Sequence, residues 1–253
     1  MKIKKILVSQ PKPKTNKSPY YDIADKYNVK IDFHPFIKVE PIYAKEFRRQ
    51  RINILAHTAI IFNARHGIDH FFRLCEEMRI TVPETMKYFC VSETVALYLQ
   101  KYIQYRKRKI FFTQTGKFAD LPALLNKHTD EKYLYVTSNV RNEETMSILE
   151  SSKITFDQAI MYKTVSNKIP AEELRDYDMM IFFSPVGIKS LFENDPNFVQ
   201  GETQIGCLGT NTAFAIREAG LRLDLEAPTP EFPSMAMALE DHLKKDRKSN
   251  GKK

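Results

Sequence analysis

The sequence has few cysteines and no long apolar run. Its three cysteines, Cys75, Cys90 and Cys207, are odd in number and far apart, which argues against a disulfide framework and a zinc site. Cys90 and Cys207 lie in apolar stretches, so we expect buried structural thiols. No stretch approaches the roughly 20 apolar residues of a membrane helix. The N-terminus lacks the long apolar region and cleavage site of a signal peptide. We therefore expect a cytoplasmic protein without a membrane partner.

Several catalytic and nucleotide-binding motifs are also absent. The chain has neither GxGxxG after its first apolar stretch nor GxxxxGK[ST], which argues against dinucleotide and P-loop sites. It has no GxSxG elbow, so an α/β-hydrolase is unsupported. His66 and His70 have a spacing that could hold a metal on one helical face, but no HExxH frame surrounds them and no third ligand is evident. We favour two surface histidines and no metal.

The positive charge is concentrated at one end of the chain. The net charge is +8, yet residues 244–253 hold six basic residues and one acidic residue, and without them it falls to +3. This segment is interpreted as a disordered basic tail. Two further basic clusters, 45–51 and 106–109, are typical of solvated helix faces and turns. A nucleic-acid-associated protein stays an alternative, with binding that weakens in salt and on deletion of the tail.

Short apolar stretches alternate with helical patterns along the chain. The stretches are continuous and not strictly alternating, which is typical of parallel strands that are covered on both faces. Helical patterns follow them; one begins at Asn142, a good N-cap residue, and one ends at Gly220. The pattern predicts parallel α/β units. The ten candidate strands are 3–8, 29–36, 59–62, 88–91, 109–113, 133–136, 156–162, 179–183, 204–208 and 222–225.

A weak internal repeat predicts two similar domains. The segment IIFNARHGIDHFF, from Ile60, precedes CVSETVALYL, from Cys90. The segment MIFFSPVGIKSLF, from Met180, precedes CLGTNTAFAI, from Cys207, in the same strand, polar turn and helix order. Ten strands divide into two sheets of five, although the repeat does not assign the first two strands to either sheet.

Small polar turns follow several of the predicted strands. Ligands bind beyond the carboxyl ends of parallel strands, and the first N–H groups of a helix there can hold an anion. Simple helix capping is the alternative for each turn. The turn residues that we consider are Asn63, Ala64, Thr94, Ser138, Ser184, Gly187, Asn211 and Thr212.

The last third of the chain resembles the uroporphyrinogen-III synthase family. DMMIFFSPVGI, from Asp178, is similar to the family pattern DxxxFxSPSG, and CLGTNTAFAIREAG, from Cys207, to IGxTTAxAxxxG. Tyr162-Lys-Thr resembles its VYxT, and Arg141 lies at the position of its arginine. The resemblance is specific over about the last 90 residues and loose before residue 130. Several positions depart from the pattern, among them Ala64, Val95 and Asn211.

The resemblance implies a fold of two similar domains, each a five-stranded parallel sheet flanked by helices, with a two-strand linker and a cleft between them. One domain would be discontinuous, from residues 1–38 and 166–243. The other would be an insertion, residues 45–160, with linker strands at 39–44 and 161–165. Residues 244–253 would form the disordered basic tail.

The resemblance also implies a reaction. Hydroxymethylbilane, a linear tetrapyrrole polycarboxylate, would lose water and close with its last ring inverted, without a metal or another cofactor. Tyr162 would donate a proton to the leaving hydroxide, and Arg141 and the turn residues above would bind substrate. A non-catalytic relative that binds a tetrapyrrole or another anion is the alternative, favoured by the departures at Ala64, Val95 and Asn211. The family implies a monomer without a nucleic-acid partner.

Overall fold

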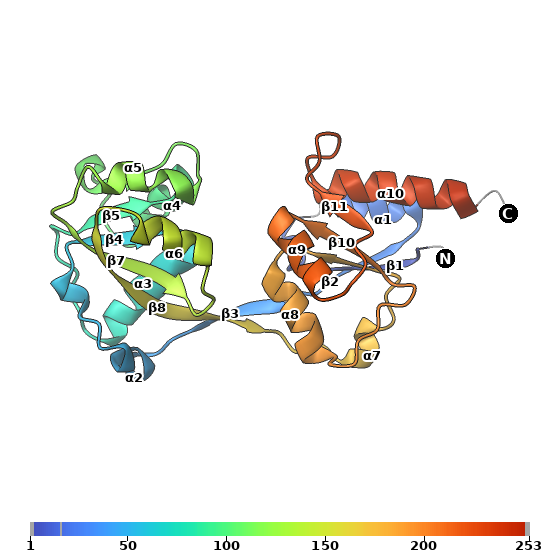
Figure 1. The fold of residues 1–253 in the computed structure, drawn as a ribbon, viewed down its shortest axis with the longest axis horizontal. Helices are drawn as coiled ribbons and strands as arrows, with labels where there is room; N and C mark the ends of the chain where they lie inside the picture. Colours follow the sequence, from blue (N-terminus) through green and yellow to red (C-terminus); the bar gives the residue numbers. More distant parts are fainter. Residues whose placement is uncertain (1–2, 16, 251–253) are drawn as a thin grey trace. The chain divides into compact units, whose positions relative to one another are not determined.

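The computed structural model describes residues 3–15 and 17–250, which form two compact units (Figure 1). Unit 1 consists of Met1–Lys38 and Val165–Lys253, and unit 2 of Val39–Thr164. The chain therefore leaves unit 1 near residue 38, builds unit 2, and returns near residue 165. Within the described residues, no helix has the length and apolar character needed to cross a bilayer.

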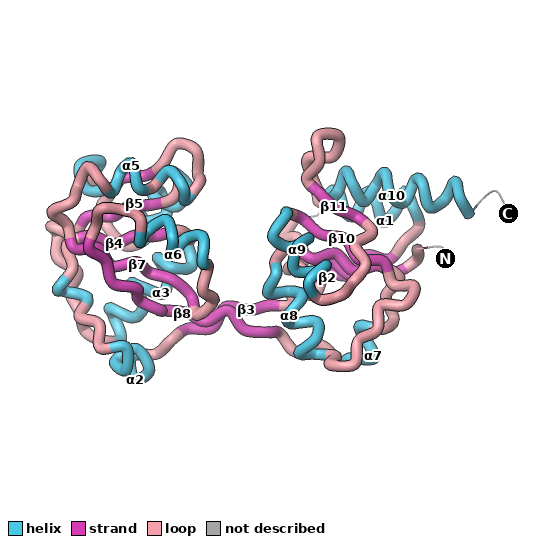
Figure 2. The backbone as a smooth tube through the Cα atoms, in the orientation of Figure 1, coloured by secondary structure: helices cyan, strands magenta, loops and turns pink. Residues whose placement is uncertain are grey.

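Unit 1 has a five-stranded parallel sheet in the order β11-β10-β9-β1-β2. Figure 2 shows the strands of each unit in magenta and the helices around them in cyan. The side chains of the unit 1 sheet alternate between two cores, because successive residues of a strand face opposite sides. Leu7 packs with α7, α8 and α9, whereas Ile6 and Val8 pack with α1 and α10. The strands are β1 (Lys5–Val8), β2 (Lys30–Phe33), β9 (Met179–Phe182), β10 (Gln204–Leu208) and β11 (Leu225–Ala227). The helices are α1 (Pro19–Tyr27), α7 (Ala171–Leu174), α8 (Pro185–Asn194), α9 (Thr210–Glu218) and α10 (Met235–Asn250).

Unit 2 has a six-stranded sheet in the order β3-β8-β7-β4-β5-β6. One core joins the sheet to α3 and α4, and a second core joins it to α5 and α6. The strands are β3 (Ile37–Pro41), β4 (Ala59–Phe62), β5 (Lys87–Cys90), β6 (Ile110–Phe112), β7 (Lys132–Ser138) and β8 (Thr155–Ser166). The helices are α2 (Ala44–Phe47), α3 (Arg65–Glu77), α4 (Glu93–Tyr98), α5 (Pro122–Leu125) and α6 (Glu143–Glu150). Short 3-10 turns lie at Arg48–Gln50, Ile54–Ala56, Leu99–Lys101, Lys107–Lys109 and Phe118–Asp120.

The sixth strand of unit 2 is β3, which the sequence analysis treated as a linker. β8 spans 12 residues, and β3 is hydrogen-bonded beside it. The pairing continues past the end of β3, where the Ile42 amide donates to the Met161 carbonyl at 3.2 Å. Backbone groups of an extended segment need partners, and the neighbouring strand supplies them. The linker therefore adds a strand to the five that were expected in this sheet.

The strand orders of the two sheets confirm the predicted repeat. β11-β10-β9-β1-β2 of unit 1 corresponds to β6-β5-β4-β7-β8 of unit 2. The correspondence extends to the glycine in the first turn of α8 and of α3. A Cβ on Gly187 would lie 3.3 Å from the Phe182 ring, and one on Gly67 would lie 3.5 Å from the Phe62 ring. The absence of a side chain at Gly187 avoids a tight contact where α8 begins over Phe182, whereas a Cβ on Gly67 would make an ordinary van der Waals contact with Phe62.

The predicted disordered tail is wrong for residues 244–250. Helix α10 continues to Asn250, and residues 251–253 lie outside the described chain. Lysine and arginine are good helix formers and are favourable near a helix C-terminus. Lys245 also forms an i,i+4 ion pair with Asp241 at 2.6 Å, and the Arg247 guanidinium lies 5.0 Å from the centre of the Tyr27 ring. The basic residues thus extend the helix, where the sequence analysis expected disorder.

Candidate functional site

Ser184 and Gly187 lie in the turn after β9 in unit 1. Ser184 is the N-cap of α8, and its Oγ accepts a hydrogen bond from the Gly187 amide at 3.2 Å. The serine side chain therefore satisfies one of the unpaired N–H groups at the start of the helix. Ser184 is partly exposed and Gly187 is buried. This turn is capped by its own serine, as the alternative interpretation of the sequence expected.

The neighbouring turn after β10 has a different structure. Gly209 precedes α9 with φ +93° and ψ 144°, and its amide donates to the Ala227 carbonyl at 2.6 Å. Among the described residues, no side-chain hydrogen bond caps the start of α9. Asn211 is exposed, whereas Thr212 is only 3% exposed. The start of α9 carries the positive end of the helix dipole and unpaired N–H groups, so it can bind an anion.

Replacing Gly209 by alanine is expected to lower the free energy of unfolding of unit 1 by about 1–3 kcal/mol, because residues with a side chain rarely adopt this backbone conformation. Nothing lies within 4 Å of an added Cβ, so packing plays no part. Urea denaturation followed by circular dichroism measures the change. Asn211→Ala, at an exposed helical position, is the control and should change stability by less than about 0.5 kcal/mol. Equal stability of Gly209→Ala and the unchanged protein would contradict the prediction.

Asn63 and Ala64 form the turn after β4 in unit 2. Ala64 occupies the N-cap position of α3 without a side-chain hydrogen bond, so the start of this helix is also uncapped. Asn63 Nδ2 donates to the Tyr135 hydroxyl at 3.0 Å. Asn63 Oδ1 is buried, with no hydrogen-bond partner among the described residues. The turn therefore offers free main-chain donors beside a side chain that Tyr135 holds in place.

Thr94 lies in the turn after β5, where a serine caps the helix. Ser92 Oγ accepts from the Val95 amide at 3.4 Å and lies 3.0 Å from Thr94 Oγ1. Thr94 is exposed and Val95 is buried. Val95 stands where the family pattern has a threonine, and the exposed hydroxyl of this turn comes from the adjacent residue.

Ser138 and Tyr162 lie side by side on neighbouring strands. They are paired in the β7–β8 register, at an irregularity between Thr137 and Ser138. The Asn139 amide donates to the Tyr162 carbonyl at 3.2 Å, and Asn139 Oδ1 accepts from the Thr164 amide at 2.7 Å. Ser138 Oγ accepts from the Val140 amide at 3.2 Å. The end of β7 thus fixes the part of β8 that carries Tyr162.

Arg141 follows the same turn and is exposed. Its Nε lies 2.8 Å from Glu143 Oε1, and both side chains are mostly in solvent. Such an exposed ion pair is weak, because water screens it. Arg141 is therefore free to exchange Glu143 for an anionic ligand at low cost.

Tyr162 is only 7% exposed, and its ring stacks on His70 with the ring centres 5.2 Å apart. Burial raises the pKa of Tyr162, so the hydroxyl stays protonated at neutral pH and can donate a proton. Burial, together with the positive charge of Arg73, lowers the pKa of His70. His70 Nδ1 is buried without a hydrogen-bond partner among the described residues. A neutral imidazole therefore packs on the phenol.

The sequence analysis placed both His66 and His70 at the surface, which is correct for His66 alone. His66 is exposed, whereas His70 is partly buried because it packs on Tyr162. Among the residues that the structure describes, no three His, Cys, Asp or Glu side chains gather as metal ligands. The three cysteines are free and buried, which confirms the expectation for Cys90 and Cys207. Burial raises the pKa of Cys207 to about 11, so it is a poor nucleophile at neutral pH.

Parallel pairing brings the predicted site residues together within each unit. In unit 1, β9 and β10 are neighbours, so the turn with Ser184 and Gly187 adjoins the one with Asn211 and Thr212. In unit 2, the turns after β5, β4 and β7 lie along one edge of the sheet, with Tyr162 on the next strand. The sequence analysis missed Tyr135 and His70. Tyr135 lies two residues after the buried Tyr133 along β7 and so shares its face of the sheet, which was the available signal for an inward side chain.

Comparisons with known proteins agree on one family. A family model described as uroporphyrinogen-III synthase HemD matches residues 22–237. A uroporphyrinogen-III synthetase structure from Helicobacter pylori has a TM-score of 0.60 at 17% identity, covering 96% of this chain and 99% of that chain. A mutant uroporphyrinogen III synthase from Thermus thermophilus has a TM-score of 0.59 at 15% identity, with the same coverage. These identities are low, so the structures show a shared fold. No curated protein sequence matches the chain.

Proposed function

Because the chain belongs to the uroporphyrinogen-III synthase family, we propose that it is a cyclising lyase that converts hydroxymethylbilane to uroporphyrinogen III. The family match over residues 22–237 is the observation that carries this proposal. The hydroxymethyl carbon loses water to give an azafulvene, the last ring attacks and rearranges, and the macrocycle closes with that ring inverted. The reaction belongs to tetrapyrrole and heme biosynthesis. The protein contributes chiefly by holding the reacting ends in the productive orientation.

The turns of both sheets are proposed to bind the acetate and propionate groups of the substrate. Helices α3 and α9 begin without a side-chain cap, so their first main-chain N–H groups are available to carboxylates. This main-chain mode tolerates Ala64 and Asn211, because neither substitution removes an N–H group. Side chains of Thr94, Ser138 and Ser184 add hydroxyls at the same edges, and Arg141 adds a positive charge.

Tyr162 is proposed to protonate the departing hydroxide. Its raised pKa keeps the hydroxyl neutral and able to donate at the pH at which the substrate carboxylates are ionised. The Asn139 amide fixes the backbone at Tyr162, and His70 fixes the ring. The proton joins the hydroxide to leave as water, so the step requires no further reactant.

The remaining proposals concern the oligomeric state of the protein and its location in the cell. We propose that it acts as a monomer in the cytoplasm, without a nucleic-acid partner. Three free, buried cysteines suit a reducing compartment. Light scattering after size-exclusion chromatography tests the first point, and a mass near 29.5 kDa is expected.

A coupled assay tests the reaction. Hydroxymethylbilane is generated by its own synthase, this protein is added, and the uroporphyrin I and III isomers are separated after oxidation. Type III is expected to dominate, whereas spontaneous closure gives type I. If the folded protein leaves type I as the product, the catalytic proposal fails. Binding of a tetrapyrrole in the same experiment would then identify a non-catalytic relative.

A further inference from the structure

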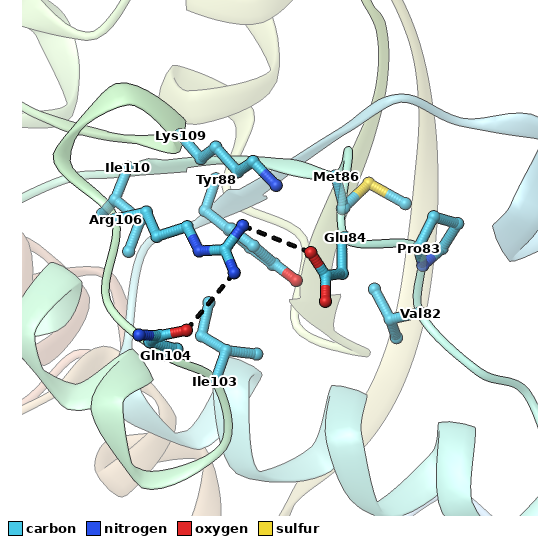
Figure 3. Close-up of a pocket in the computed structure, with 10 residues that line it drawn as sticks. All are labelled: Val82, Pro83, Glu84, Met86, Tyr88, Ile103, Gln104, Arg106, Lys109 and Ile110. Atoms are coloured by element: carbon cyan, nitrogen blue, oxygen red, sulfur yellow. Dashed lines mark hydrogen bonds and ion pairs between the residues drawn. The ribbon is translucent and has the colours of Figure 1, made fainter.

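Unit 2 contains a hollow of ≈ 190 Å³ at the amino-terminal ends of β5 and β6 (Figure 3). Tyr88, the second residue of β5, and Ile110, the first residue of β6, both line it. The proposed substrate turns follow the carboxyl ends of the strands of the same sheet. The hollow is therefore separate from them. At ≈ 30 Å³ per water molecule, it has room for about six waters or one small ring, and not for a tetrapyrrole.

The inner wall of the hollow is apolar. It includes Met86 and Ile110, which are buried, and Val82 and Ile103, which pack against the same core. Tyr88 adds an aromatic surface and a hydroxyl group, and its side chain is held by ring contacts with Phe62 and Phe72. Such a wall favours an apolar body with a polar end.

The opposite wall carries two basic side chains and one acidic side chain. Arg106 Nη1 lies 3.2 Å from Glu84 Oε2, and Arg106 Nη2 donates to Gln104 Oε1 at 3.3 Å. Lys109 is partly buried, and its ammonium has no carboxylate partner among the described residues. Figure 3 shows the Lys109 ammonium, the Arg106 guanidinium and the Tyr88 hydroxyl turned toward the same space. With Glu84 offsetting one positive charge, the lining keeps a net charge of +1, which one carboxylate would neutralise.

We propose that this hollow binds a small organic monocarboxylate with an apolar ring. The ring lies against Met86, Ile103 and Ile110, and the carboxylate pairs with Lys109 and receives hydrogen bonds from Arg106 and the Tyr88 hydroxyl. Two features select this occupant. The Lys109 ammonium has no carboxylate partner among the described residues and attracts an anion, and the apolar wall gains free energy when apolar surface covers it. The basic cluster 106–109 thus has a role in a small-molecule site, and the sequence analysis had taken it for a solvated turn.

Phenylacetate is the probe, and methyl resonances of the protein report its binding. We expect saturable chemical-shift changes at the methyl groups of Met86, Ile103 and Ile110 in the full-length protein. Phenethylamine, which has the same ring and a positive charge, should leave these methyl groups unchanged. Lys109→Gln should weaken phenylacetate binding at least fivefold. Arg108→Gln is the matched control, because it removes the same charge from a side chain that is exposed and does not line the hollow.

Three outcomes would overturn the proposal. They are the absence of saturable shifts with phenylacetate, equal shifts with phenethylamine, and equal weakening by Arg108→Gln and Lys109→Gln. Methyl groups of Ile61 and Leu125 serve as the folding check for each variant, because they lie in the second core of unit 2 and do not line the hollow.

Discussion

Tyr162→Phe is expected to slow the formation of uroporphyrinogen III by about 10²–10⁴-fold, the usual contribution of a positioned proton donor. Phenylalanine keeps the ring that stacks on His70 and removes the hydroxyl alone. The fold should therefore persist, and substrate binding through the turns should change little. Initial rates in the coupled assay, with the I to III isomer ratio, measure the effect.

Tyr133→Phe is the matched control for this substitution. Tyr133 lies in the same unit, and its hydroxyl donates to the main-chain carbonyls of Leu125 and His128. Its loss should cost about 1 kcal/mol of stability and leave the rate of type III formation unchanged. Full activity of Tyr162→Phe, or equal losses in the two variants, would remove Tyr162 as the donor.

The direction in which pH changes the rate of uroporphyrinogen III formation follows from the pKa of Tyr162. Burial raises the pKa of Tyr162 above the ordinary tyrosine value of about 10. The proton is present below the raised pKa and is lost as the pH rises through it. The rate due to Tyr162 should therefore hold through neutral pH and fall only above about pH 10. That alkaline fall should be absent in Tyr162→Phe.

Phe182→Ala is expected to lower the free energy of unfolding of unit 1 by about 3–5 kcal/mol, as is typical when a large buried aromatic residue is truncated. Phe182 is fully buried, and its ring meets Phe36 edge to face with the centres 5.1 Å apart. It also lies directly under Gly187, so its loss leaves a void beneath the start of α8. Hydrogen exchange at increasing urea, read by mass spectrometry on peptides of each unit, measures the change.

Unit 2 provides the control for this prediction. Its cores are made of different residues, so its peptides should keep their protection in Phe182→Ala. Phe62→Ala is the corresponding change in the repeat, because Phe62 lies under Gly67 as Phe182 lies under Gly187. Phe62→Ala should lower the protection of unit 2 peptides and leave the protection of unit 1 peptides unchanged. Equal loss of protection in both units from either substitution would contradict the independence of the cores.

The sequence predicted the strands that bear the turns, and with them much of the candidate site. The predicted strands 59–62 and 204–208 coincide with β4 and β10, because continuous apolar stretches bounded by polar turns leave little freedom in placing a buried strand. β3 could not be assigned to a sheet, because its pairing depends on how far β8 extends. The end of α10 was missed because charge was weighed above helix propensity.

The contacts around the site residues were less predictable than the residues themselves. Asn63 meets Tyr135 across 72 positions of sequence, and His70 meets Tyr162 through a helix packed on a strand. Periodicity indicates which face of an element is buried, but it does not indicate which side chain of another element lies opposite. These pairings follow from the register of β4, β7 and β8, which only the folded sheet defines.

The discontinuity of unit 1 has a consequence during synthesis on the ribosome. β1 is an inner strand that pairs with both β2 and β9, and roughly 170 residues separate it from β9. At about 5–20 residues per second, translation needs roughly 10–30 s to supply the missing neighbour. All of unit 2 is made in that interval and can fold first. One edge of the apolar β1–β2 pair stays open throughout, which makes the nascent N-terminal segment a natural client for a chaperone.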